Sequence, residues 1–426
     1  LTGAQQRAVE EILRDFRKGA PMNRLVQGDV GSGKTMVAAA AAYCAARNGK
    51  QSALMAPTEI LAEQHFASLN KLFEPLGITV GLLTGSMTPK QKRVLRERIA
   101  SGDVQVTVGT HALLTEATQF QNLGLVIADE QHRFGVAQRS KLSSKGEDPH
   151  LLVMSATPIP RTLALLMYGD LEVSILDERP PGREDVDTFL VNESYRPRIN
   201  AFIRKHVSEG HQCFVVCPAV EESEELGIKA ATVWAETLQQ TVFPDLRIAL
   251  LHGQMKGAEK EAAMTSFARG EADVMVATTV IEVGVDVPNA TLMVIEDADR
   301  FGLSQLHQLR GRVGRGSSKS YCILTSRNRN PETLQRLKAL CKTTDGFKIA
   351  EEDLKLRGPG DFFGQRQSGL PTFKVANLSY DLTTLKDAQR ASADWIDQYG
   401  TSDIPEAKAL RERIGDLFTR AEGTMN

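Results

Sequence analysis

The sequence has few cysteines, few aromatic residues and no long hydrophobic segment. Its five cysteines are an odd number without a CxxC pair, which argues against a disulfide framework or a cysteine-based zinc site. Aromatic residues make up 6% of the chain, so platforms that stack single-stranded bases are not expected. The longest apolar run, residues 36–46, has 11 residues, whereas a membrane helix needs about 20. We therefore expect a cytoplasmic protein without a membrane span.

A strong net charge is absent as well, which argues against a protein that binds nucleic acid over its whole surface. The 426 residues carry a net charge of −2 at pH 7, and 24% of them are charged. Such proportions are typical of globular proteins, and a chain of this length usually forms about two or three domains. Any nucleic-acid site must therefore be local.

Short apolar runs rich in Val, Ile and Leu alternate with helical stretches along much of the chain. Runs of this kind predict parallel strands that are buried on both faces and connected by helices. Strands are expected at residues 22–27, 52–56, 104–109, 123–128, 151–155, 187–191, 212–217, 247–251, 273–277, 292–296 and 321–324. Helices are expected at residues 34–47 and 59–73.

Proline and glycine interrupt this pattern between residues 178 and 186, where neither a helix nor a central strand can continue. We interpret this segment as a connector between two α/β units in tandem. From about Asp345 onward the pattern becomes loop-like, with residues 356–364 at its centre, and the tail after Leu378 has a helical pattern. The predicted regions are an α/β unit at 1–180, a second α/β unit at 187–344 and a third region at 345–426.

The segment Gly28-Asp-Val-Gly-Ser-Gly-Lys-Thr35 has the pattern GxxxxGK[ST] between an expected strand and an expected helix. Its glycines let backbone amides curl around phosphate oxygens, and the helix N-terminus adds partial positive charge. Lys34 supplies a point charge to the outer phosphates, and the Thr35 hydroxyl suits Mg²⁺, which prefers oxygen ligands. We predict a nucleoside triphosphate site formed by Asp29, Val30, Gly31, Ser32, Gly33, Lys34 and Thr35.

Two carboxylates follow the expected strand at residues 123–128. Asp129 would hold the metal ion, and Glu130 would orient and deprotonate the attacking water. Alone, such a pair is weak evidence, since acidic residues at a strand end often cap the next helix. Together with the phosphate loop, the pair predicts hydrolysis of a nucleoside triphosphate with Mg²⁺.

The second unit contributes arginines instead of a phosphate loop. Arg312 and Arg315 are three residues apart, and a helix would place them on one face. Alternatively, these arginines could simply form a solvent-exposed face of a helix. If these guanidinium groups enter the nucleotide site of the first unit, they would stabilise charge on the γ-phosphoryl group, an effect of roughly 10³–10⁵ in other NTPases. The nucleotide would then bridge the two units, and each hydrolysis would open the cleft between them.

One part of the chain is distinctly basic. Residues 300–374 hold 15 Lys or Arg against 6 Asp or Glu, nine positive charges in excess. A basic surface is often simply solvated. Beside a nucleotide-driven motor, however, contact with a polyanion is the favoured interpretation.

These motifs, in this order, resemble a superfamily 2 helicase core. The resemblance is carried by residues 1–5, 28–35, 56–59, 109–113, 129–132, 155–157, 251–254, 278–286 and 308–315. It implies two RecA-like domains with parallel sheets, in which Gln5 reads the adenine of ATP. It also implies that Gly284 and Asp286 touch the nucleotide. For contact with DNA, or for coupling to it, the implied residues are Thr58, His111, Arg161 and Thr279.

More narrowly, the chain resembles the RecG family of bacterial DNA helicases over nearly all of residues 1–380. The most specific segments are 129–135, 155–161, 279–284 and 356–370. The last of these resembles a translocation motif that the family shares with transcription-repair coupling translocases. In that family a helical hairpin carrying the motif couples cleft movement to travel on double-stranded DNA, which implies coupling roles for Arg357, Gly364 and Gln367. An ordinary surface loop would also fit the glycine and proline content of this segment.

The resemblance implies an ATP-dependent motor that remodels branched DNA, such as stalled forks and Holliday junctions, in recombination and repair. A monomer is expected, with the wedge domain of the family N-terminal to the residues of this chain. Two alternatives stay open. The same motor could instead belong to a transcription-repair coupling translocase, because residues 357–371 fit both families. The chain could also be a DNA-binding module that uses nucleotide as a clamp, although the phosphate loop, Glu130, Arg312 and Arg315 argue against it.

Overall fold

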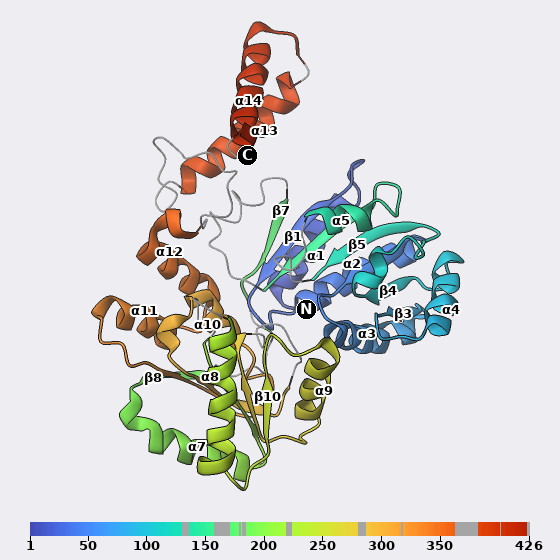
Figure 1. Cartoon of the computed structure of the whole chain (residues 1–426). Coiled ribbons are helices and arrows are strands. Elements are labelled where there is room, and N and C mark those ends of the chain that lie inside the picture. The colour runs from blue at the N-terminus through green and yellow to red at the C-terminus, as the bar shows by residue number, and fades with distance from the viewer. Residues whose placement is uncertain are drawn as a thin grey trace. The chain divides into compact units, whose positions relative to one another are not determined.

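The computed structural model describes most of the chain, and every structural statement below concerns the described residues (Figure 1). These are residues 1–129, 136–156, 171–178, 180, 185–218, 224–279, 287–316, 318–362, 382–400 and 402–423. The described residues up to Ile349 belong to one compact unit, and the described residues from Ala350 onward belong to a second. The first unit contains two parallel sheets, each with its own helices, which we call the first and the second lobe.

The first lobe is built on a seven-stranded sheet with the order β3-β4-β2-β5-β6-β1-β7. All of its strand pairs are parallel. Its strands are β1 (Asn23–Gly28), β2 (Gln51–Met55), β3 (Val80–Leu83), β4 (Val106–Gly109), β5 (Leu123–Ala128), β6 (His150–Ser155) and β7 (Glu172–Leu176). Its helices are α1 (Gly3–Asp15), α2 (Lys34–Arg47), α3 (Glu59–Phe73), α4 (Pro89–Ala100) and α5 (Val136–Ser143), with short 3-10 turns at Glu74–Leu76 and His111–Leu114.

Helices cover both faces of this sheet, as the alternation along β2 illustrates. Leu54 belongs to the buried cluster that includes Val37 of α2. Its neighbours Ala53 and Met55 belong to a different cluster, which includes Ile99 of α4. Because successive side chains of a strand point to opposite faces, these memberships place one core on each side of the sheet.

The second lobe repeats this plan with a six-stranded parallel sheet of order β10-β11-β9-β12-β13-β8. Its strands are β8 (Asp187–Val191), β9 (Gln212–Val216), β10 (Ile248–Leu251), β11 (Val274–Ala277), β12 (Ala290–Ile295) and β13 (Tyr321–Thr325). Its helices are α7 (Arg196–Ser208), α8 (Glu224–Thr237), α9 (Gly257–Ala268), α10 (Leu303–Arg310) and α11 (Pro331–Lys342), with short helical turns at Glu193–Tyr195, Leu238–Val242 and Ala298–Arg300.

The core of the second lobe also positions α10. Leu306 and Leu309 of this helix are fully buried in the cluster that contains Phe214 and Phe267, whose rings lie 4.8 Å apart. Packing of a leucine stripe against the sheet anchors α10 and fixes which of its residues face elsewhere. This orientation matters because α10 carries part of the arginine-rich motif.

The two parallel sheets confirm the predicted tandem α/β fold. The expected helices at 34–47 and 59–73 have the bounds of α2 and α3. Two strands were not predicted. β3 has only four residues and contains a glycine, and β7 begins with Glu172 at the edge of the sheet, so neither has the continuous apolar pattern of a central strand.

The loop-like pattern predicted after Asp345 is wrong for its first part, where α12 spans Gly346–Phe362. Two local features support the helix. The Asp345 carboxylate accepts from the amide of Phe347 at 3.0 Å, as a helix N-cap does. Ile349, Ala350 and Asp353 are buried, and their spacing of three and four residues puts them on one face. After its first residue, this helix has glycine and proline only near its end, where they do not prevent its earlier turns from forming.

The tail beyond Leu378 is helical, as predicted. It contains α13 (Leu382–Tyr399) and α14 (Pro405–Gly423), both in the second compact unit (Figure 1). Among the described residues, no helix combines the length and the apolar character that crossing a membrane requires.

The five cysteines, all described, are free thiols. Burial raises the pKa of Cys217 and of Cys322 to about 12, so both stay protonated at neutral pH. These two cysteines are therefore packed core residues and not nucleophiles.

The start of α12 provides a test of the capping argument. Replacing Asp345 by Ala removes the side-chain acceptor for the Phe347 amide, at a cost of about 1 kcal/mol to the first turn. The amides of Phe347 and Lys348 should then exchange hydrogen roughly fivefold faster. Asp345→Asn keeps a capping oxygen and should exchange as the wild type does. Equal exchange in the Ala variant would contradict the capping role.

Candidate nucleotide site

The predicted phosphate loop connects the end of β1 with the start of α2. β1 ends at Gly28 and α2 begins at Lys34, so the loop lies at the carboxyl edge of the first sheet, where parallel α/β sheets bind their ligands. Gly31 and Gly33 have φ angles of 77° and 83°, a region that strains residues with a side chain. The loop therefore has the backbone shape, and the helix N-terminus, that phosphate groups require.

Lys34 lies over the loop that it follows. Its ammonium group donates to the carbonyl of Gly28 at 2.8 Å and to that of Asp29 at 2.9 Å. Thr35 is half-buried in the first turn of α2. These positions bring the predicted phosphate-binding and metal-binding side chains to one end of α2.

Gln5 reaches this loop from α1. Its Nε2 donates to the Ser32 carbonyl at 2.9 Å, and its Oε1 accepts from the Thr2 amide at 2.9 Å. A Cβ atom added to Gly33 would overlap the Gln5 amide, so only glycine allows this close approach. The structure thus brings Gln5 to the nucleotide loop, and its contact with adenine stays a prediction.

Asp129 follows β5 at the same carboxyl edge and is held by a histidine that we did not predict. His65 Nε2 of α3 lies 2.7 Å from Asp129 Oδ2, and both side chains are largely buried. The Asp129 amide donates to the Met55 carbonyl at 3.0 Å, which fixes the backbone at this point. No local pattern links residues 64 positions apart, so the sequence carried no signal for this pair.

The second lobe touches the phosphate loop through α10 and the turn that follows it. His307 Nε2 lies 2.5 Å from Asp29 Oδ1, and both side chains are buried. A Cβ atom added to Gly311 would lie 2.9 Å from Val30 Cβ, so the two backbones approach closely. The arginine-rich motif of the second lobe therefore begins directly against the loop. His307 was not among the predicted site residues.

The two predicted arginines do not lie on a helix. α10 ends at Arg310, Gly311 is its C-cap, and Gly314 has a φ of 75°. Arg312 and Arg315 therefore belong to the turn after the helix, in which Gly314 adopts the left-handed conformation that favours glycine. Arg312 is buried, and the Arg315 Nε donates to the Gly311 carbonyl at 3.1 Å.

The residues predicted for DNA contact or coupling are spread over several elements. Thr58 caps α3, with its hydroxyl accepting from the Leu61 amide at 3.3 Å. His111 is exposed at the start of a 3-10 turn, and Thr279 is half-buried just after β11. Arg357 lies in α12. The predicted residues outside the described part of the chain are Glu130, Arg161, Gly284, Asp286, Gly364 and Gln367.

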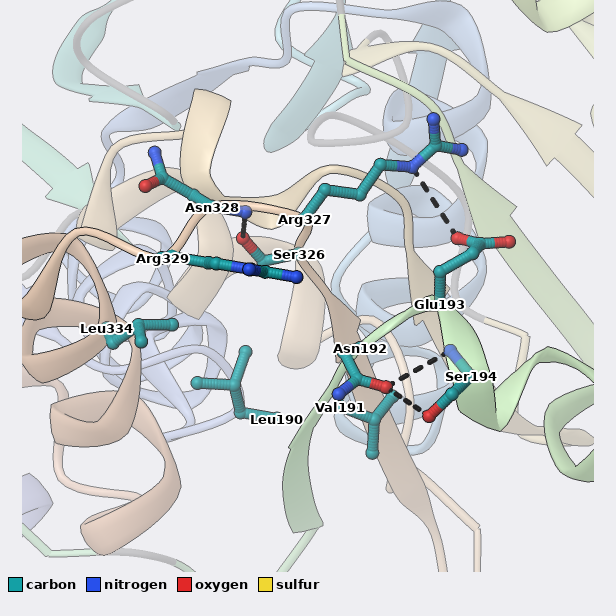
Figure 2. A pocket seen from close by; sticks show the side chains of 10 residues that line it. All are labelled: Leu190, Val191, Asn192, Glu193, Ser194, Ser326, Arg327, Asn328, Arg329 and Leu334. Carbon is teal, nitrogen blue, oxygen red and sulfur yellow. Dashed lines mark hydrogen bonds and ion pairs between the residues drawn. The ribbon is translucent and has the colours of Figure 1, made fainter.

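A cavity of about 570 Å³ lies elsewhere in the second lobe, at the carboxyl ends of β8 and β13 (Figure 2). Glu193 faces it and lies 3.7 Å from Arg327. Hydrogen bonds from Arg196 on the same carboxylate hold the pKa of Glu193 below its usual range. None of the individually predicted nucleotide or DNA residues lines the cavity, although Arg327 and Arg329 belong to the basic segment 300–374.

Three protein families match successive parts of the chain. Residues 2–166 match the DEAD/DEAH box helicases, and residues 197–317 match the helicase conserved C-terminal domain. Residues 343–421 match the C-terminal part of domain 3 of ATP-dependent DNA helicase RecG.

Several curated proteins are similar over almost the whole chain. The ATP-dependent DNA helicase RecG of Synechocystis is 55% identical over 392 residues, which cover 92% of this chain and 47% of that protein. The proteins of the same name from Bacillus subtilis and Escherichia coli K12 are 48% and 52% identical over 97% of this chain. The chain spans 61% and 60% of their lengths. It therefore covers about half to three fifths of these relatives.

Solved structures agree with these matches. A structure of RecG bound to a three-way DNA junction has a TM-score of 0.77 and 48% identity, covering 91% of this chain and 50% of that one. The helicase Mss116p bound to single-stranded RNA has a TM-score of 0.60 at 16% identity, covering 98–99% of this chain and 86% of that one, and shows the shared fold alone.

Gly311 offers a test of the contact between α10 and the loop. Gly311→Ala places a Cβ against Val30, and such overpacking costs about 1–3 kcal/mol. Affinity for ATP should fall roughly 5- to 150-fold if nucleotide binding requires this contact. Titration with a fluorescent ATP analogue measures the change. Gly257→Ala, at a position with open space around it, should bind as the wild type does. Unchanged affinity of Gly311→Ala would mean that the contact is not needed.

Proposed function

We infer that this chain, which belongs to the RecG family of ATP-dependent DNA helicases, is an ATP-driven motor that translocates on double-stranded DNA. The observation that carries this inference is the contact of α10 with the phosphate loop at Asp29 and Val30. A nucleotide held by the loop would lie next to the second lobe, so that its binding and hydrolysis would close and open the cleft. This chain covers only 47% and 61% of two of its relatives. The activity of a protein of their full length is therefore part of this proposal.

The phosphate loop would hold the triphosphate through its backbone amides and Lys34. Thr35 and Asp129 offer a hydroxyl and a carboxylate, both hard oxygen donors at the carboxyl edge of one sheet, and these fit Mg²⁺. When bound, Mg²⁺ neutralises charge on the phosphates. The hydrogen bond from His65 orients Asp129 for this role.

The remaining nucleotide roles follow the motif assignments. Glu130 would activate the attacking water, and Arg312 and Arg315 would stabilise charge on the γ-phosphoryl group. The position of the Gly311 turn against Val30 supports the arginine roles, because both arginines follow directly. Gln5 would read the adenine, and Gly284 and Asp286 would touch the nucleotide from the second lobe.

DNA would be held by its phosphate backbone. The excess of nine positive charges within residues 300–374, from 15 Lys or Arg against 6 Asp or Glu, supports this mode in a chain of net charge −2. Thr58, His111, Arg161 and Thr279 would contact the strands or link them to hydrolysis. Arg357, Gly364 and Gln367 would couple cleft movement to travel.

The substrate of the full-length protein would be branched DNA at stalled forks and Holliday junctions. A relative at 48% identity has been solved with a three-way DNA junction, which supports this choice. The match of residues 343–421 to a RecG domain favours it over a transcription-repair coupling client. A non-hydrolysing clamp is not favoured by the family matches either.

We also propose that the protein works as a monomer in the cytoplasm, with a wedge domain N-terminal to these residues. The greater length of the relatives supports a further domain, since the chain covers 47% and 61% of two of them. Mass measurement in solution and the sequence of the whole gene would test these points.

The proposed function predicts hydrolysis that depends on DNA. ATP hydrolysis should rise many-fold with linear duplex or forked DNA compared with no DNA, and it should fall as salt rises, because phosphate neutralisation releases counterions. Lys34→Ala should abolish hydrolysis with folding intact, whereas Lys71→Ala, at an exposed position of α3, should not change it. A phosphate-release assay with no DNA, single strand, duplex and fork measures this. Hydrolysis that no DNA affects would reject the proposal.

The arginine roles predict a loss confined to turnover. Arg312→Ala should lower kcat by roughly 10³–10⁵ while ATP still binds, because the guanidinium acts on charge that develops in the transition state. Circular dichroism establishes that the variant, which alters a buried residue, is folded. Arg269→Ala removes an exposed arginine of the same lobe and should hydrolyse normally. Wild-type kcat in a folded Arg312→Ala variant would exclude Arg312 from the nucleotide site.

A further inference from the structure

The phosphate loop contains one acidic residue, Asp29, among the groups predicted to surround a triphosphate. A carboxylate in such a loop repels the phosphates unless its charge is compensated or directed elsewhere. Asp29 Oδ1 accepts from the Val30 amide at 2.6 Å and lies 2.5 Å from His307 Nε2. The same oxygen therefore joins the loop backbone to the second lobe.

Arg310 determines the direction of the hydrogen bond between His307 and Asp29. A guanidinium group has donors and no acceptor. Because the Arg310 Nη2 lies 2.9 Å from His307 Nδ1, this ring nitrogen must accept, and the hydrogen is on Nε2. His307 Nε2 accordingly donates to Asp29. The two residues are three apart on α10, on the same side of the helix.

Arg310 is itself held in place. Its Nη1 donates to the carbonyls of Leu340 at 2.7 Å and Thr343 at 2.9 Å, at the C-terminal end of α11. Arg310 is 3% exposed, so its positive charge is little screened by water. Arg310, His307 and Asp29 thus form a chain of hydrogen bonds from a buried cation to the carboxylate of the phosphate loop.

We propose that His307 is a positioning residue that compensates Asp29 and turns its carboxylate away from the phosphates. The first lobe then binds a triphosphate tightly only while α10 of the second lobe touches the loop. This inference rests on the proposed function in one respect, namely that the loop takes ATP. It adds that the affinity of the loop is set by a hydrogen-bond donor from the other lobe, which stabilises and orients the Asp29 carboxylate.

A pair of substitutions at His307 separates this contact from packing. Asn can still accept from Arg310 near the Nδ1 position but is too short to reach Asp29. Gln places an amide nitrogen near the Nε2 position and so keeps a donor for Asp29. His307→Asn should weaken binding of a non-hydrolysable ATP analogue at least tenfold, and His307→Gln should stay within about threefold of the wild type.

Removing the charge of Asp29 is the decisive measurement. Asp29→Asn keeps an acceptor for the Val30 amide but has no charge to compensate. In the His307→Asn background it should restore most of the lost affinity, which a merely structural role of His307 would not allow. Isothermal titration calorimetry on the full chain, with circular dichroism to establish folding, gives all of these affinities. If His307→Asn does not fold, His307→Leu with and without Asp29→Asn takes its place.

Each outcome of this experiment decides between the two proposals. Wild-type affinity in a folded His307→Asn variant overturns the positioning role and leaves the proposed function intact. A double variant that binds as weakly as His307→Asn also overturns it, since the defect would then not arise from charge. A wild-type chain that does not bind ATP overturns the proposed function and this inference with it.

Discussion

The close approach of two backbones, the phosphate loop of the first lobe and the turn after α10 of the second, is the constraint on which the site depends. It requires glycine at position 311, because a side chain there would meet Val30. It also requires a polar partner for Asp29, which His307 supplies. Without this approach the phosphate loop of the first lobe and the arginine-rich turn of the second lobe would not lie next to each other.

Both lobes reach this approach through the same architecture. In a parallel sheet all strands end at one edge, so the loop after β1 and Asp129 after β5 come from distant parts of the chain to the same edge. In the second lobe, burial of Leu306 and Leu309 fixes the rotation of α10 about its axis and so determines where His307 and Arg310 lie. The apolar residues thus determine where the polar ones can act.

Much of the fold could be predicted because its signals are local. The bounds of α2 and α3 follow from a phosphate-loop glycine and a threonine cap, and the central strands follow from continuous apolar runs. The short strand β3 and the edge strand β7 lack such runs. For α12, the cap at Asp345 and a buried face upstream outweighed the glycine and proline near its end.

The chemistry could be predicted from short segments of sequence, because a phosphate loop, a carboxylate after a strand and an arginine-rich run are each recognisable within a few residues. The sequence by itself could not determine which of these groups meet. His65 with Asp129, and His307 with Asp29, join residues that are 64 and 278 positions apart. Only the packing of helices on the two sheets brings such pairs into contact, since no local pattern records a partner so far along the chain.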